Sequence, residues 1–366
     1  MTGTGPVVVL PNRFANEVRN NKSLSFNRYF DKDFFVNYPG FEACRTGYKD
    51  GTFIQEVVRT KLTQSLGLVT KDLVDEMTDT CQHVLGNDAQ FHEICVKQAT
   101  SKIVAKLSSR VFLGKNLARN DKWLRIAASY THDSYSAAHE LRQWNMLLRP
   151  FASSFLPNLR RLRREVQEAT SLIMPEVGLR KAVVDEALKA GNKPPKSADA
   201  IGWMHEVCRG RQVNYVHGQL FLSFAAIHTT TETITGCLFD ISYYPQIVQP
   251  LREEIIQVLG QEGWSRTALH KLKLLDSFMK ESQRRHPMGT TSMHRHADAD
   301  IQLSDGSLIR KGTRVMVSAS TFMNPEVYPD PEKYDIYRFY NLRSAPGQEN
   351  AYQRRQEELN LDTLDC

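Results

Sequence analysis

The sequence predicts a mainly α-helical protein with a small β region toward its C-terminal end, and three observations support this fold class. Apolar residues recur at helical spacing along most of the chain. The stretch 220–234 (LFLSFAAIHTTTETI) combines an apolar body with a block of hydroxyls, which is typical of a helix in the middle of a protein. Short strand-like segments appear after Pro287. We expect a single domain over residues 1–353, with its sheet near 291–318, and a divergent tail at 354–366.

The predicted elements follow in order along the chain. A strand is expected at Val7–Leu10, then a helix through Val18, then a long loop over 27–51 because of the turn sequence Asn37-Tyr-Pro-Gly40. Apolar spacing predicts helices over 53–86 (in two pieces on either side of Gly67), 91–112, 123–148, 156–189, around Trp203, over 220–234, 247–259 and 268–285. Strands are expected at 291–296, 301–303, 308–309 and 315–318, with a hairpin turn at Asp305-Gly306.

Composition excludes several classes of protein. With 366 residues, of which 41% are hydrophobic and 24% charged, the chain is an ordinary globular protein. The net charge of +6 is too small to indicate nucleic-acid binding. Six scattered cysteines lack C-x-x-C spacing, so neither a zinc ribbon nor a disulfide framework is expected. The apolar run before Pro11 is too short for a membrane anchor, so the chain as written is expected to be cytoplasmic.

Two groups of residues are candidates for a structural or catalytic role. Glu281 and Arg284 lie three residues apart on a predicted helix, which places both on one face, and Arg338 follows a proline-rich stretch and can share the carboxylate. Such a network, if buried, fixes one arrangement of the surrounding chain. In the central helix, the hydroxyls of Thr229 to Thr231 are expected to bond carbonyls one turn back and to open a polar gap in an apolar core.

Together these stretches resemble the cytochrome P-450 haem-thiolate monooxygenases. The segments LSFAAIHTTTET and SSRVFLGKNLARNDKW are similar to sequences of the fungal branch near ent-kaurene oxidase, which includes related mycotoxin and terpenoid hydroxylases. The resemblance implies the cytochrome P-450 fold, incomplete at both ends, and oxygen insertion into an apolar secondary metabolite such as a terpenoid. It also implies haem as cofactor, NADPH-cytochrome P-450 reductase as partner, and the surface of the endoplasmic reticulum membrane as the parent family's location.

The resemblance also assigns roles to residues. Thr229 matches the threonine that helps to deliver protons in oxygen activation, His228 beside it is a second catalytic candidate as a proton relay, and Ala225 on the same helix is a candidate cofactor contact. Glu281, Arg284 and Arg338 match the family's structural network. Arg295 matches a haem-propionate contact, and Arg59 is a second candidate for such a contact.

The sequence departs from the family pattern at three places. Ala226 and His228 replace the usual glycine and acid, although a histidine can also relay protons. Ile336 stands where a proline is frequent. The loop that carries the cysteine ligand does not follow Gln353, and Cys366 lacks the glycine-rich surroundings of such a ligand, so no metal ligand is assigned and the chain as written is not expected to complete the catalytic cycle.

Three other readings remain open. His294 and His296, with His286 nearby, could hold zinc, but no third ligand stands at a recognised spacing and a buried histidine pair is expected. The basic cluster Arg160, Arg161, Arg163 and Arg164 could meet an acidic partner, although a solvated helix face is expected. The alternative to an enzyme is a non-catalytic remnant that binds an apolar small molecule.

Overall fold

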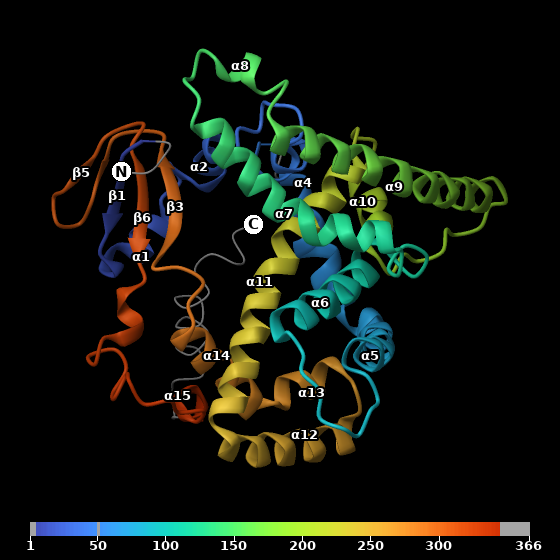
Figure 1. Cartoon of the computed structure of the whole chain (residues 1–366), viewed down its shortest axis with the longest axis vertical. Helices are drawn as coiled ribbons and strands as arrows, with labels where there is room; N and C mark the ends of the chain where they lie inside the picture. The colour runs from blue at the N-terminus through green and yellow to red at the C-terminus, as the bar shows by residue number, and fades with distance from the viewer. Residues whose placement is uncertain (1–4, 50–51, 345–366) are drawn as a thin grey trace. The chain divides into compact units, whose positions relative to one another are not determined.

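The computed structural model describes residues 5–49 and 52–344 of the chain, and it confirms a mainly helical fold with a small β region (Figure 1). The described residues form two compact units. The first contains residues 5–30 and 232–344, and the second contains residues 31–49 and 52–231. The helix α11 (Tyr215–Tyr243) belongs to the second unit up to Thr231 and to the first unit from Glu232 onward.

The first unit contains the sheet. Its four strands have the order β1 (Val7–Leu10), β6 (Arg314–Ser318), β3 (Thr291–Ala297) and β2 (Leu24–Ser25) (Figure 1). The pair β1 and β6 is parallel, and the other two pairs are antiparallel. A bulge between Ser292 and Arg295 changes the register of β3, and Met293 there has a φ of 50°. The strands β1, β3 and β6 therefore lie where the sequence predicts them, whereas β2 was not predicted.

A hairpin and a small core complete this sheet region. The strands β4 (Ile301–Gln302) and β5 (Leu308–Ile309) pair around the predicted turn, where the Gly306 N–H donates to the Leu303 carbonyl at 2.9 Å. The apolar face of the sheet is buried with the helix α1 (Ala15–Asn20) in a cluster that includes Val18, Val315 and Val317. Alternation of apolar residues along β6 explains this one-sided burial.

The first unit also contains helices. They are η1 (Asn12–Phe14), α2 (Phe26–Asp33, which begins there), η4 (Pro245–Ile247), α12 (Val248–Glu262), α13 (Arg266–Lys271), α14 (Lys273–Arg285), η5 (Ser320–Met323) and α15 (Arg338–Ser344). The carboxylate of Glu254 accepts the backbone N–H groups of Leu274 at 2.7 Å and Leu275 at 2.9 Å. A side chain of α12 thus caps the first turn of α14.

The second unit consists of helices. They are α3 (Glu42–Cys44), η2 (Arg45–Lys49), α4 (Thr52–Val57), η3 (Val58–Leu62), α5 (Thr63–Leu85), α6 (Val96–Leu113), α7 (Asp121–Arg142), α8 (Arg149–Ala152), α9 (Pro157–Lys189) and α10 (Ala200–Cys208). The pairs α5 with α6 and α7 with α9 pack against each other (Figure 1). The side chains of Trp123, Leu159 and Trp203 are among the largest in its core.

Five predicted elements are corrected. The loop expected over 27–51 instead contains α2, α3 and η2, because its aromatic residues, such as Tyr29 and Phe41, are buried in the core. Gly67 does not break the helix, which runs through it in α5. The helix expected over 268–285 is divided at Leu272, whose ψ of 65° is not helical. The helices expected over 91–112 and 123–148 begin at Val96 and end at Arg142, respectively.

None of the described helices is long and apolar enough to cross a membrane.

Candidate active site

The helix α11 carries the predicted polar gap. The Thr229 hydroxyl donates to the carbonyls of Ala225 at 2.8 Å and Ala226 at 3.2 Å, and the Thr231 hydroxyl donates to the Ile227 carbonyl at 2.7 Å. Leu220 and Ile227 are completely buried, whereas Ala225, Ala226 and Thr229 are half-buried. The helix therefore presents a narrow strip of small and hydroxylated residues along an otherwise apolar surface.

His228 lies beside this strip and is held from α7. Its Nε2 is 3.1 Å from the Ala128 carbonyl, which fixes the ring and favours the tautomer with a proton on Nε2. Nδ1 is then the atom that can accept a proton. The structure thus places Ala225, His228 and Thr229 on one stretch of a single helix, all of it in the second unit.

Glu281, Arg284 and Arg338 come together in the first unit. The Glu281 carboxylate accepts Arg284 Nε and Nη2, both at 2.8 Å, and Arg338 Nε at 3.2 Å and 3.4 Å. The side chains of Glu281 and Arg284 have an exposed fraction of 0% and that of Arg338 has 9%. An ion pair this deeply buried is stable only when its remaining hydrogen-bonding groups are also satisfied.

Backbone carbonyls satisfy those remaining groups. Arg284 donates to the carbonyls of Phe322 at 2.6 Å and Pro331 at 2.8 Å. Arg338 donates to the carbonyls of Pro329 at 2.6 Å, Lys333 at 2.9 Å and Asp330 at 3.1 Å. The two guanidinium groups therefore hold the proline-rich stretch by its carbonyls, which is why a segment without regular structure keeps one conformation.

Two contacts around this network could not be predicted from the sequence. The Ser277 hydroxyl donates to the Ile336 carbonyl at 2.5 Å and accepts the Tyr340 N–H at 2.8 Å, so it joins α14 to α15. Arg284 also lies over the ring of Tyr328, 5.4 Å from its centre. No spacing in the sequence distinguishes Ser277 from the other serines of the chain.

The two candidate propionate contacts differ in environment. Arg295 is buried in β3, with its guanidinium 5.5 Å from the centre of the Phe26 ring and Nη1 3.1 Å from the His294 carbonyl. A buried cation of this kind suits an anionic group such as a carboxylate. Arg59 is exposed on η3. Arg295 belongs to the first unit and Arg59 to the second.

The donors expected for a haem thus fit in part. An axial thiolate requires a cysteine with a lowered pKa. Burial raises the pKa of the Cys44 and Cys237 thiols, and the Cys208 thiol donates to the His205 carbonyl at 2.9 Å. Cys81 lies within α5, and Cys95 is exposed just before α6. Burial thus favours the protonated thiol form of Cys44 and Cys237, and Cys366 lies outside the described residues.

The three histidines considered for zinc do not form a metal site. His296 Nδ1 is 3.0 Å from an Asp298 oxygen, the ring of His294 packs edge-on against Tyr29, and His286 Nε2 is 2.9 Å from Asp240. Among the described residues, no group of three potential metal ligands gathers. The histidines instead pair with neighbouring carboxylates and aromatic rings.

Comparison with known proteins agrees with the geometry. The family model for cytochrome P-450 matches residues 1–353. The chain is 44% identical over 352 residues to the cytochrome P-450 monooxygenase bsc2 of Alternaria brassicicola, covering 96% of this chain and 67% of that protein. It is 41% identical over 355 residues to cytochrome P-450 monooxygenase 1 of Gibberella fujikuroi, covering 96% of this chain and 80% of that protein.

A third relative extends the same pattern within the fungi. The cytochrome P-450 monooxygenase pyr3 of Aspergillus fumigatus is 39% identical over 355 residues, which cover 96% of this chain and 67% of pyr3. The match therefore includes α11, the Glu281 network and the sheet. The chain belongs to the cytochrome P-450 family of haem-dependent monooxygenases.

Proposed function

We propose that this protein inserts one oxygen atom into an apolar secondary metabolite, with terpenoids as the first substrate class to test, and that residues 1–353 act as one catalytic domain. The observation that supports this best is the half-buried strip of Ala225, Ala226 and Thr229 on α11. A strip of small residues leaves room for a flat cofactor and a substrate, and a single hydroxyl on it can direct a proton. The fungal monooxygenases to which the chain is similar support the same chemistry.

Thr229 has the role of passing a proton along this strip. Its hydroxyl donates to the carbonyls of Ala225 and Ala226, and a hydroxyl can accept one proton while it gives up another. Nε2 of His228 is directed at the Ala128 carbonyl, so Nδ1 is the atom that accepts a proton. His228 can then replace the proton that Thr229 has given up. The imidazole thereby takes the place of the acid that is usual at this position.

Haem, when bound with a thiolate ligand, would supply electron density that favours cleavage of the O–O bond, and thereby an oxidant able to attack an unactivated C–H bond. Arg295, and with it Arg59, would hold its carboxylates. The side chains of Leu220 and Ile227 on α11 are fully buried in the core of the second unit, so the helix is apolar beside the strip. NADPH-cytochrome P-450 reductase is the electron donor that the family implies.

A location at the membrane surface of the endoplasmic reticulum is supported by the connection from α7 to α9. Met146, Leu147 and Phe151 in this connection have exposed fractions of 70%, 83% and 73%. The basic cluster, Arg160 to Arg164, follows on α9. Exposed apolar side chains next to arginines suit the interface of an anionic bilayer.

Flotation with anionic vesicles tests this location. The protein with Leu147→Asp and Phe151→Asp should no longer float with the vesicles. The control protein with Leu179→Asp and Val183→Asp, on the distal end of α9, should still float with them.

A pair of threonine variants tests the proposed catalysis. The protein made from its complete transcript would be assayed with reductase, NADPH and a panel of terpenoids, and product with one added oxygen would be measured by mass. We expect Thr229→Ala to lower product formed per NADPH consumed by at least about tenfold, because it removes the proton donor. Thr230→Ala is the matched control, since that side chain is exposed. Equal losses in both variants would refute the role of Thr229.

The second candidate function is a non-catalytic protein that binds an apolar small molecule. The observation that favours it is that burial raises the pKa of the Cys44 and Cys237 thiols, which favours their protonated form. It predicts saturable binding of a terpenoid without any oxygenated product in the same assay. The monooxygenase proposal would then be withdrawn.

A further inference from the structure

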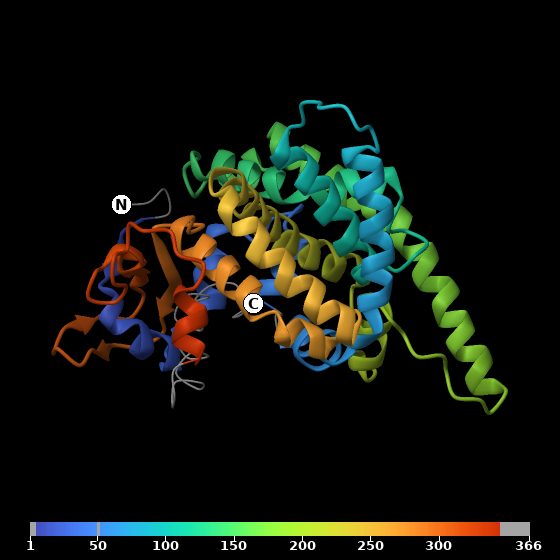
Figure 2. The same cartoon turned by 90° about the horizontal axis from the view of Figure 1, so that it is seen from below.

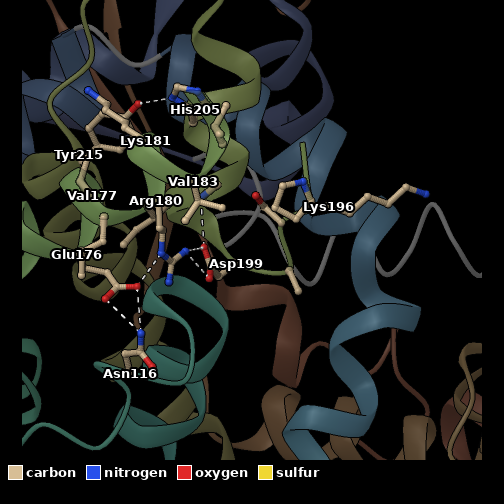
Figure 3. A pocket seen from close by; sticks show the side chains of 17 residues that line it. Asn116, Glu176, Val177, Arg180, Lys181, Val183, Lys196, Asp199, His205 and Tyr215 are labelled. Atoms are coloured by element: carbon tan, nitrogen blue, oxygen red, sulfur yellow. Dashed lines mark hydrogen bonds and ion pairs between the residues drawn. The ribbon is translucent and has the colours of Figure 1, made fainter. Parts of the chain in front are cut away.

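A cavity of about 370 Å³ lies in the second unit, away from the strip on α11. Its walls are the distal part of α9, the connection that contains Pro195 and Lys196, the start of α10 and Tyr215 at the beginning of α11 (Figure 3). Tyr215 precedes Thr229 by 14 positions on one helix, which is a separation of roughly 21 Å at 1.5 Å per residue. We call this space the α9 cavity.

A charged clamp builds one wall of the α9 cavity. Arg180 bonds Glu176 at 2.7 Å and both oxygens of Asp199 at 2.5 Å and 2.6 Å, and its Nη2 donates to the Leu113 carbonyl at 2.9 Å. Asn116 donates to both oxygens of Glu176 at 3.3 Å (Figure 3). Asp199 is also the N-cap of α10. The clamp therefore fixes the distance between α9 and α10 before any ligand arrives.

The same two helices also give the cavity an apolar lining. Val177 and Ile201 form buried parts of it, and Val183 and Val184 continue it toward solvent. The last buried residue of α9 is Val177, so the remaining turns of this helix lie outside the core of the unit. Figure 2 shows this part of α9 extending beyond the neighbouring helices, with the chain returning beside it. Ligand sites combine such apolar walls with a few polar groups in a volume of this size.

The polar groups that the clamp leaves available carry positive charge. The Lys181 ammonium lies 5.1 Å from the centre of the Tyr215 ring, and the Tyr215 hydroxyl is 3.2 Å from His205 Nδ1 (Figure 3). Lys196 stands at the rim. In the described part of the chain, neither lysine forms an ion pair. Since Glu176 and Asp199 are both engaged by Arg180, the cavity offers its cations and not its carboxylates to a ligand.

We propose that the α9 cavity is a second ligand site, which binds an apolar organic acid by its carboxylate. The carboxylate pairs with Lys181 and accepts a hydrogen bond from Tyr215, whose pKa is raised by burial so that the phenol keeps its proton. The apolar chain lies along Val177, Val184 and Ile201. This inference stands apart from the proposed catalysis, because none of these residues belongs to the strip on α11.

Dodecanoate titrated calorimetrically into the purified full chain tests the proposal. We expect saturable binding that Val184→Trp weakens by at least about tenfold, because the indole fills the cavity. The matched control is Val166→Trp, which makes the same substitution at a half-buried position of α9 that does not line the cavity. Circular dichroism confirms that both variants are folded.

A second pair of variants tests whether the positive charge of Lys181 contributes to binding. Lys181→Met should weaken dodecanoate binding by about three- to tenfold, whereas Lys189→Met, at another exposed position of α9, should not. Dodecylamine, which has the same chain and the opposite charge, should not bind at this site. The proposal is overturned if Val184→Trp and Val166→Trp bind dodecanoate equally well, or if Lys181→Met binds it as tightly as the parent chain.

Discussion

Replacing Glu281 by glutamine should destabilise the first unit severely. The carboxylate accepts four contacts from Arg284 and Arg338 and a fifth from the Asp335 N–H at 3.2 Å. Glutamine keeps the shape but leaves two guanidinium groups in the core without a counter-charge. Removing one partner of a buried ion pair typically costs about 3–5 kcal/mol, and the backbone bonds of the two arginines are then strained as well. We expect a loss near the middle of that range.

Native-state hydrogen exchange provides a local readout of this loss. The Asp335 amide donates directly to Glu281, so its protection reports on the network without requiring the whole chain to unfold in one step. A loss of about 4 kcal/mol corresponds to roughly a thousandfold faster exchange. The control is Glu262→Gln, which removes a partly exposed ion pair with Lys271 in the same unit and should change stability by less than about 1 kcal/mol. Less than a tenfold change at Asp335 in Glu281→Gln would refute the assigned role.

Two further predictions concern the second unit. Burial, with the nearby Asp133 carboxylate adding to it, raises the pKa of Glu165 from 4.5 to about 7. Stability that is present below about pH 4.5 is therefore lost as the pH rises toward 7, and Glu165→Gln should exceed the parent by about 2–3 kcal/mol at pH 8 but not at pH 4 in urea unfolding. A gap that stays constant with pH would contradict this. Gly67→Ala should stabilise α5 by about 0.5–1 kcal/mol, because nothing lies within 4 Å of the added methyl. Gly47→Ala should instead destabilise by about 1–3 kcal/mol, since its methyl would come within 2.1 Å of the Phe221 ring, and equal melting temperatures would refute the contrast.

The sequence was sufficient where structure depends on local pattern. The spacing of Glu281 and Arg284 places them on one face of α14, and the alternation in β6 buries one face of the sheet. The hydroxyls of α11 bond the carbonyls one turn back, as their position in a helix dictates.

Structure that depends on distant partners could not be predicted. The division at Leu272 coincides with capping of α14 by Glu254, a residue on another helix. The helices within 27–51 form because their aromatic residues are buried, which outweighs the turn chemistry of Asn37-Tyr-Pro-Gly40. The clamp of Arg180 joins residues from three separate segments, so no spacing in the sequence indicates it.

The spectrum of the reduced protein with carbon monoxide tests the central claim most directly. The protein would be produced from its complete transcript, reconstituted with haem and compared with its Thr229→Ala variant, which should bind haem equally well. The account predicts a thiolate-type spectrum in both proteins, because Thr229 acts on protons and does not hold the cofactor. Absence of that spectrum in a folded, haem-saturated preparation would contradict the monooxygenase account and leave the binding protein as the function of this chain.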